Sequence, residues 1–148
     1  MEIRARVILR KNEDKRLLAG HLWVFSNEIS LTEGSAANGD LVEVFGFNGH
    51  YLGTGFYNLN SLIAVRILFK DRTTSVFDLL RTRILAADRR RVELGFSGTY
   101  RMVFGESDML PGLVIDRYDN CFVIESYSAG IDQLISPLTD IADAEFHP

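Results

Sequence analysis

The sequence has little cysteine, little proline and no long apolar segment. It contains one cysteine and three prolines in 148 residues. A lone Cys121 cannot form a disulfide within the chain, which excludes a disulfide-stabilised fold and predicts a reducing, cytoplasmic location. No apolar run approaches the roughly 20 residues that span a bilayer, and residues 1–4 lack the apolar core of a secretory signal. We therefore expect neither a membrane partner nor export.

The charge shows no large excess of one sign, but it is unevenly distributed. The formal net charge is −4. Residues 1–20 hold six Lys and Arg against three Asp and Glu (+3), whereas residues 101–148 hold two against nine (−7). Because binding depends on the local field, a basic N-terminal edge on an acidic body can still meet phosphate. The alternative, which the charge pattern alone favours, is an ordinary solvated strand.

Short strand patterns fill the first half of the chain. Residues 3–9 mostly alternate apolar and basic side chains, and residues 62–69 form an apolar run. Residues 41–47 and 50–56 are separated by Asn48-Gly49, a strong hairpin signal when both turn residues take positive φ. Five or six short strands with interspersed glycines predict a small closed or half-closed barrel.

A helical pattern begins at Ser75. Its apolar face runs to Leu94 and is interrupted only by Arg91. Ser75 with Asp78 three residues later resembles a capping box, and Gly95 predicts the C-terminal stop. The cations at 89–91 fit the negative end of the helix dipole, an interpretation that we prefer to a phosphate clamp.

The last third of the chain predicts strands and a second helix. Residues 100–104 and 113–118 bracket a loop, and Asp119-Asn120 turns the second run onto residues 121–127. Residues 131–142 fit a helix with Pro137 inside it, which predicts a kink; a shorter helix with Ser136 as N-cap is the alternative. The fold class is therefore α+β, with a domain boundary at 70–75.

Several segments match a known family in order along the chain. They are residues 15–26, 53–61, 65–68, 100–108, 110–113 and 116–118. As a set they resemble the N-terminal half of bacterial S-adenosylmethionine-dependent methyltransferases that modify carbon 5 of cytosine in large-subunit ribosomal RNA. Two positions depart from the family pattern. Leu22 stands where proline is usual, and Met109 places a long side chain where glycine allows any backbone shape.

The resemblance implies a domain organisation. Residues 1–72 would be a PUA-like RNA-binding β-barrel, and residues 73–148 a central α/β domain with a long helix and an antiparallel hairpin. Whether the central domain is complete stays open. The catalytic S-adenosylmethionine domain has no counterpart in this chain, so we expect no cofactor here and infer S-adenosylmethionine only for the parent enzyme. Cys121 matches no catalytic motif, and we expect it to be structural.

Candidate RNA-binding residues lie in two segments of the first domain: Lys15, Arg16, His21 and Trp23, then Tyr57, Asn58, Asn60 and Ser61. Lys15 and Arg16 would contact phosphate, a sequence-independent and salt-sensitive interaction. His21 and Trp23 would stack on an unpaired base, and the residues after 56 would read base edges or phosphate oxygens. The alternatives are that Trp23 belongs to the core and that the loop side chains cap a turn.

Glu106 and Asp108 are close carboxylates whose role the sequence leaves open. No histidine or third acid lies near them in the sequence to complete a metal or catalytic site, so we expect no catalytic or metal-binding residue. A turn in which Asp108 bonds its own backbone is the preferred interpretation.

These observations favour one function and leave two alternatives. The preferred hypothesis is the RNA-binding and substrate-positioning portion of a ribosomal RNA methyltransferase, inactive by itself, with structured RNA as its partner. The first alternative is a stand-alone PUA-type adaptor or dimerisation module, and a homodimer stays open. The second, weaker alternative is a small hydrolase that uses Glu106 and Asp108.

Overall fold

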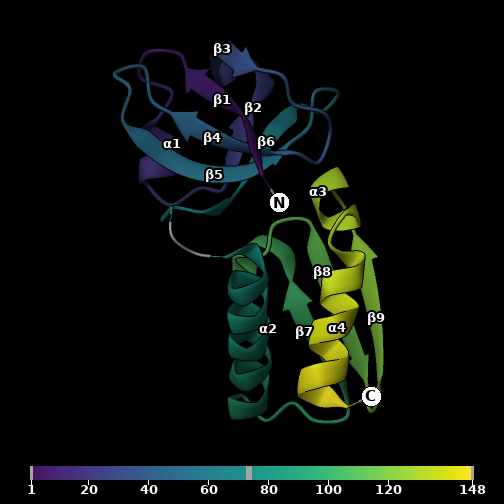
Figure 1. The fold of residues 1–148 in the computed structure, drawn as a ribbon. Helices are drawn as coiled ribbons and strands as arrows, with labels where there is room; N and C mark the ends of the chain where they lie inside the picture. The colour runs from purple at the N-terminus through teal and green to yellow at the C-terminus, as the bar shows by residue number, and fades with distance from the viewer. Residues whose placement is uncertain (1, 73–74, 148) are drawn as a thin grey trace. The chain divides into compact units, whose positions relative to one another are not determined.

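The computed structural model describes residues 2–72 and 75–147. The chain divides into two compact units between residues 73 and 74 (Figure 1). The predicted boundary between domains 1–72 and 73–148 falls on residues 73 and 74, which lie outside the described residues.

The first unit is a six-stranded sheet with one helical turn. Its elements are β1 (Ile3–Leu9), α1 (Lys15–Leu18), β2 (Trp23–Phe25), the 3₁₀ turn η1 (Ser26–Glu28), β3 (Ile29–Gly34), β4 (Leu41–Phe45), β5 (Tyr51–Tyr57) and β6 (Ile63–Phe69). The strand β3 has no clear alternation of buried and exposed residues, which explains why its sequence gave no strand signal.

The strand order is β2-β6-β5-β4-β1-β3, and all neighbours are antiparallel except β1 and β4. β1 therefore lies inside the sheet and not at its edge. Ala5, Val7 and Leu9 are buried in the core, so Arg4 and Arg6, which alternate with them, stand on the opposite face. The alternation of apolar and basic residues over 3–9 therefore forms, as predicted, a strand with one buried face and one face that presents arginines.

The sheet curls, as Figure 1 shows, but its strand order runs from β2 to β3 without closing into a ring. The sequence predicted a closed or half-closed barrel, and the structure has the half-closed form.

The predicted hairpin between β4 and β5 is confirmed, although its turn differs. Gly49 has φ 78°, whereas Asn48 is not among the residues with positive φ. The N–H of Gly49 donates to the carbonyl of Gly46, and the N–H of Gly46 donates to the carbonyl of His50, both at 2.9 Å. This is a three-residue connection with one left-handed glycine, so Phe47 stands at the tip of the hairpin.

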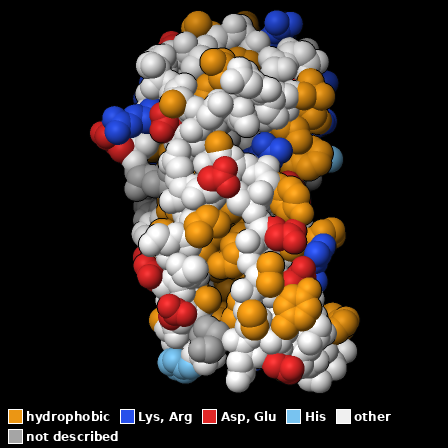
Figure 2. All heavy atoms as spheres, turned by 90° about the vertical axis from the view of Figure 1, so that its right-hand side faces the viewer, with side chains coloured by type: hydrophobic (Ala, Val, Ile, Leu, Met, Phe, Trp, Pro, Cys, Tyr) orange, Lys and Arg blue, Asp and Glu red, His pale blue; other side chains and the backbone are white. Residues whose placement is uncertain are grey.

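The second unit packs helices on a three-stranded antiparallel sheet. Its elements are α2 (Val76–Glu93), β7 (Thr99–Phe104), the 3₁₀ turn η2 (Gly105–Asp108), β8 (Leu113–Tyr118), β9 (Cys121–Ser126), α3 (Ala129–Asp132) and α4 (Ile135–Phe146). The strand order is β7-β8-β9, and α2 and α4 lie side by side over one face of the sheet (Figure 1). Hydrophobic side chains gather over this unit on the side that Figure 2 presents.

Helix α2 begins and ends as predicted. The Ser75 hydroxyl oxygen accepts the N–H of Asp78 at 3.3 Å. At the other end, the N–H groups of Gly95 and Phe96 donate to the carbonyls of Val92 and Arg91, while Gly95 takes φ 90°. This is a Schellman motif, which requires the left-handed glycine.

The predicted kinked helix over 131–142 is wrong. The chain forms two helices, α3 and α4, with Gln133 and Leu134 between them. Pro137 is the third residue of α4, where its missing N–H would have no partner within the helix. The proline therefore fits the first turn of a new helix, close to the shorter alternative.

Candidate nucleic-acid interface

The first group of candidate residues surrounds the helical turn α1. Leu17 is buried and anchors the turn, and its carbonyl accepts the Lys70 ammonium at 2.8 Å. Gly20, with φ 101°, ends the turn and directs the chain into β2. Lys15 and His21 are exposed. We call Lys15, Arg16, His21 and Trp23 the α1 corner.

Arg16 is held by a buried carboxylate that the sequence did not single out. Its Nη2 lies 2.7 Å from Oε1 of Glu28, and its guanidinium carbon lies 4.6 Å from the centre of the Phe25 ring. The other oxygen of Glu28 accepts the N–H of Phe25 at 2.8 Å. Because Glu28 neutralises Arg16, the exposed Lys15 supplies the net positive charge of the corner.

Trp23 lies on the edge strand β2 and is 36% exposed. Its ring meets Phe25 edge to face, with centroids 6.3 Å apart and an angle of 83° between the planes. Phe25 in turn contacts Arg16, so Trp23, Phe25 and Arg16 form one ordered series of planar groups. An indole that is fixed in this way and partly exposed can receive a nucleobase.

The second group lies after β5 and mainly supports its own loop. The Asn58 side-chain oxygen accepts the N–H of Asn60 at 3.1 Å, and the Ser61 hydroxyl accepts the N–H of Ile63 at 3.2 Å. Tyr57 is 8% exposed and belongs to the hydrophobic core. Asn60 remains exposed. The turn-capping alternative therefore describes Asn58 and Ser61, and burial withdraws the Tyr57 ring from the surface.

Strand β2 joins the two groups. Trp23 is paired with Arg66 of β6, and the N–H of Ser26 donates to the carbonyl of Leu62 at the end of the loop, at 2.9 Å. At about 3.3 Å per residue, Trp23 and Ser26 are about 10 Å apart along the chain. The pairing of β2 with β6 therefore links the α1 corner to the loop at 58–62.

Asp108 is a structural carboxylate. Its two oxygens accept two N–H bonds from Arg91 at 2.6 Å each, and one of them also accepts the N–H of Phe104 at 2.7 Å. Burial raises the pKa of Asp108, but the bonds from Arg91 and Phe104 and the charges of Arg91 and Arg90 outweigh it and lower the pKa. The carboxylate thus ties η2 to α2, which is more than the local turn that the sequence predicts. The ion pair with Asp108 also explains why Arg91 interrupts the apolar face of α2.

Glu106 is exposed in the same turn. Among residues 2–72 and 75–147, no three His, Cys, Asp or Glu side chains are grouped to hold a metal ion. With Asp108 committed to Arg91, the hydrolase alternative receives no support from this turn. Within the same described ranges, no helix is both long and apolar enough to cross a membrane.

Comparison with known proteins gives matches over both units. Residues 7–70 match the family of PUA-like domains. The chain is 34% identical over 131 residues to "Ribosomal RNA large subunit methyltransferase I" of Klebsiella pneumoniae, covering 86% of this chain and 33% of that protein. It is 39% identical over 134 residues to the protein of the same name in Pseudoalteromonas atlantica, covering 87% and 34%. The chain thus spans about a third of the length of these relatives.

Solved structures agree on the fold. A putative SAM-dependent methyltransferase from Streptococcus mutans has a TM-score of 0.80 at 13% identity, covering 99% of this chain and 38% of that one. A putative methyltransferase complexed with SAH has the same TM-score at 14% identity. At such low identity, these matches establish similarity of fold only.

Proposed function

We propose that the chain is the RNA-binding and substrate-positioning portion of a large-subunit ribosomal RNA methyltransferase. Residues 7–70 match the family of PUA-like domains, and the chain is similar to such enzymes over most of its length. The reaction of the parent enzyme would be methyl transfer from S-adenosylmethionine to carbon 5 of a cytosine. A ribosomal substrate would also place the protein in the cytoplasm.

The observation that carries this proposal is the α1 corner. The exposed Lys15 precedes Arg16, whose guanidinium lies 4.6 Å from the centre of the Phe25 ring. Phe25 in turn meets the partly exposed indole of Trp23 edge to face. An ammonium group contacts phosphate without regard to sequence, and an indole stacks on an unpaired base. Together they provide the two contacts that recognition of a single-stranded loop in structured RNA requires.

The described residues do not form a Rossmann-type site for S-adenosylmethionine. Cofactor sites of the Rossmann type lie at the carboxyl ends of parallel strands that lead into helices. The sheet of the second unit is antiparallel throughout. In the first unit, β4 is parallel to β1 but leads into the β5 hairpin. We therefore assign no step of the reaction to this chain, and its part in the enzyme would be to bind and orient RNA.

The test is a titration of the chain with a fragment of large-subunit ribosomal RNA at several salt concentrations. We expect log affinity to fall linearly with log salt, because bound phosphates release counterions. Lys15→Gln should reduce that slope by about one unit or less. Arg89→Gln removes an exposed cation of the second unit and serves as the control. A slope that is flat for the unmodified chain would contradict the proposal.

Trp23 gives a second readout, since it is the only tryptophan. Stacking of a base on its ring should quench the intrinsic fluorescence as RNA is added. Trp23→Phe should weaken binding less than Trp23→Ala, because phenylalanine keeps a ring for stacking.

A stand-alone PUA-type adaptor is the second candidate function. The mass of the native protein, measured in cells, distinguishes this adaptor from a methyltransferase. A mass about three times that of this chain, with a glycine-rich strand–turn–helix after residue 148, would favour the methyltransferase, because this chain covers 33% of its relative. A native protein of 148 residues that binds RNA would favour the adaptor.

A further inference from the structure

A second surface of the first unit has a composition suited to nucleic acid. It is the face of β3, β1 and β4 that points away from the core. Arg6 of β1 is paired with Glu33 of β3 and with Glu43 of β4. Two residues further along β1, Ile8 is paired with Leu31 of β3 and with Phe45 of β4. Directly paired residues share a face, and the hairpin tip adds Phe47. We call Arg6, Ile8, Leu31, Phe45 and Phe47 the β1 face.

The β1 face holds a shallow groove of about 190 Å³, lined by Arg6, Ile8, Glu33, Phe45, Phe47 and Gly49. Phe47 is 58% exposed and Leu31 52% exposed. A single exposed apolar side chain is ordinary, but a contiguous group around a groove marks a binding surface. The volume is well below that of a site for a drug-sized ligand, so it suits a small planar group such as one nucleobase.

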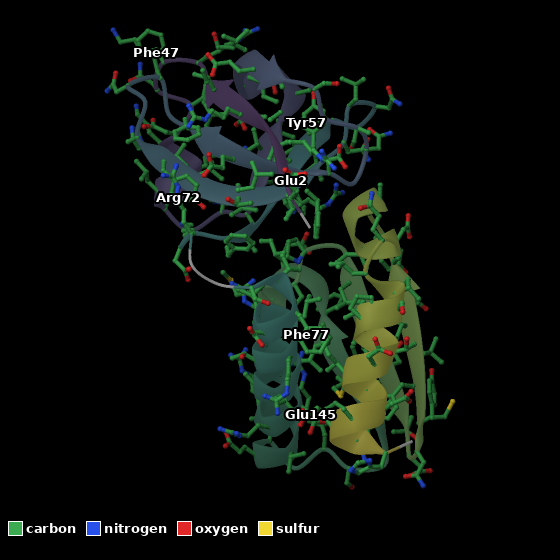
Figure 3. All side chains as sticks on the ribbon, in the orientation of Figure 1. Glu2, Phe47, Tyr57, Arg72, Phe77 and Glu145 are labelled. Atoms are coloured by element: carbon green, nitrogen blue, oxygen red, sulfur yellow. The ribbon has the colours of Figure 1, made fainter. Side chains whose placement is uncertain are left out.

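Arginines accompany these rings. The Arg6 guanidinium lies 5.2 Å from the centre of the Phe45 ring, and the Arg72 guanidinium lies 5.6 Å from Phe45 and 4.4 Å from Tyr51. The buried Glu43 lies 3.8 Å from Arg6 and 3.0 Å from Arg72. Figure 3 labels Phe47 near the top of the first unit and Arg72 near its bottom, both toward the left of the view. Both arginine side chains remain more than half exposed, so donors are left for a ligand.

The row of cations continues along β1. Arg4 alternates with the core residues of β1 as Arg6 does, so it stands on the same face, and Arg10 follows the last residue of the strand. Alternate residues of a strand are about 7 Å apart, a spacing that allows successive arginines to meet successive phosphates of an extended nucleic-acid strand. Arg4 also pairs with Glu2 at 3.1 Å, and Arg10 donates to the carbonyl of Ile29 at 3.2 Å.

We propose that the β1 face binds single-stranded RNA, with a base stacked on Phe47 over the groove and the arginines of β1 on the phosphates. The proposal rests on the proposed function, because it assumes that the first unit docks RNA, and it adds a surface that the α1 corner does not include. Single strands expose base faces to aromatic side chains, whereas a duplex keeps them stacked. The pairing of exposed rings with cations therefore selects the single-stranded form.

The experiment measures binding of the 148-residue chain to a 5′-fluorescein single-stranded RNA of roughly 12 nucleotides, by fluorescence anisotropy. We expect Phe47→Ala to weaken binding about 5- to 150-fold and Phe47→Trp to bind at least as tightly as the unmodified chain. Phe77→Ala is the matched control, because Phe77 is an exposed phenylalanine of the second unit. Since Phe47 is exposed, its replacement should leave the melting temperature unchanged. Arg6→Gln should lower the salt slope by about one unit.

The outcomes separate the two proposals. If the unmodified chain binds but Phe47→Ala and Phe77→Ala bind equally well, the β1 face is not an RNA platform, and the α1 corner stands alone. If Phe47→Ala instead converts a dimer to a monomer without loss of RNA affinity, the face is an interface between copies, which also overturns this inference. If the unmodified chain does not bind RNA, both proposals fail.

Discussion

Met109 has a backbone conformation that glycine adopts more easily. It follows η2 with φ 61° and ψ 25°, the left-handed region, and its side chain is largely exposed. Its carbonyl accepts a hydrogen bond from Arg83. The family that the sequence resembles tends to have glycine at this position. The structure explains this preference, because the turn places the residue in the left-handed region even when it is a methionine.

We expect Met109→Gly to raise the free energy of unfolding by about 0.5–1 kcal/mol, because relief of the left-handed strain exceeds the entropy that glycine adds to the unfolded chain. Urea denaturation measures the change. Met109→Ala is the control, since alanine keeps the strain and should give no gain. A gain of equal size from alanine would place the effect in the side chain instead of the backbone.

At the scale of elements, the ion pair of Arg91 and Asp108 connects the last turns of α2 to η2, across 17 residues of sequence. The side chain of Asp108 is 2% exposed and that of Arg91 15% exposed. Removing one partner of such a pair leaves an uncompensated buried charge, which is more costly than the pair is worth.

We expect Asp108→Asn to lower the free energy of unfolding by about 3 kcal/mol at neutral pH. Because the folded-state pKa of Asp108 is lowered, its contribution is present above the pKa of the unfolded carboxyl and is lost as pH falls through the folded-state pKa. The difference between the variant and the unmodified chain should therefore shrink below about pH 4. Urea denaturation over a pH series measures this.

Asp116→Asn is the matched control for Asp108→Asn. Asp116 also accepts two bonds from an arginine, Arg101, at 2.9 Å each. Arg101 is far more exposed than Arg91, so water screens its charge when the partner is lost. A loss for Asp116→Asn as large as that for Asp108→Asn would show that burial is not the reason.

At the scale of the whole molecule, the chain divides into two compact units. The core cluster that contains Val7, Val44 and Ile67 is confined to residues of the first unit. The charge is divided as well. Residues 1–72 hold nine Lys and Arg against eight Asp and Glu (+1), and residues 73–148 hold seven against twelve (−5). A polyanion should therefore be attracted to the first unit, as both proposed surfaces require.

The division into two compact units predicts local effects on stability. We expect Asp108→Asn to speed amide hydrogen exchange in β7 and β8 while leaving the amides of β4 and β5 unchanged. Residue-resolved NMR exchange measures both sets in one sample. Equal acceleration in β4 and β5 would mean that the two units unfold as one cooperative body.

The sequence by itself determined the features that depend on neighbouring residues. The β4–β5 hairpin follows from Gly49, and α2 follows from Ser75 and the glycine after its last turn, because caps and turns are set within a few residues. The α1 turn before Gly20 is of the same kind.

Only the tertiary structure decided which distant groups meet. It placed β1 inside the sheet, paired Arg16 with Glu28 and Arg91 with Asp108, buried Tyr57 and gathered the β1 face from three strands. Strand order and long-range ion pairs depend on how whole faces pack against each other. A carboxylate and its guanidinium carry no mark in the sequence that identifies them as partners, so this information appears only when the chain folds.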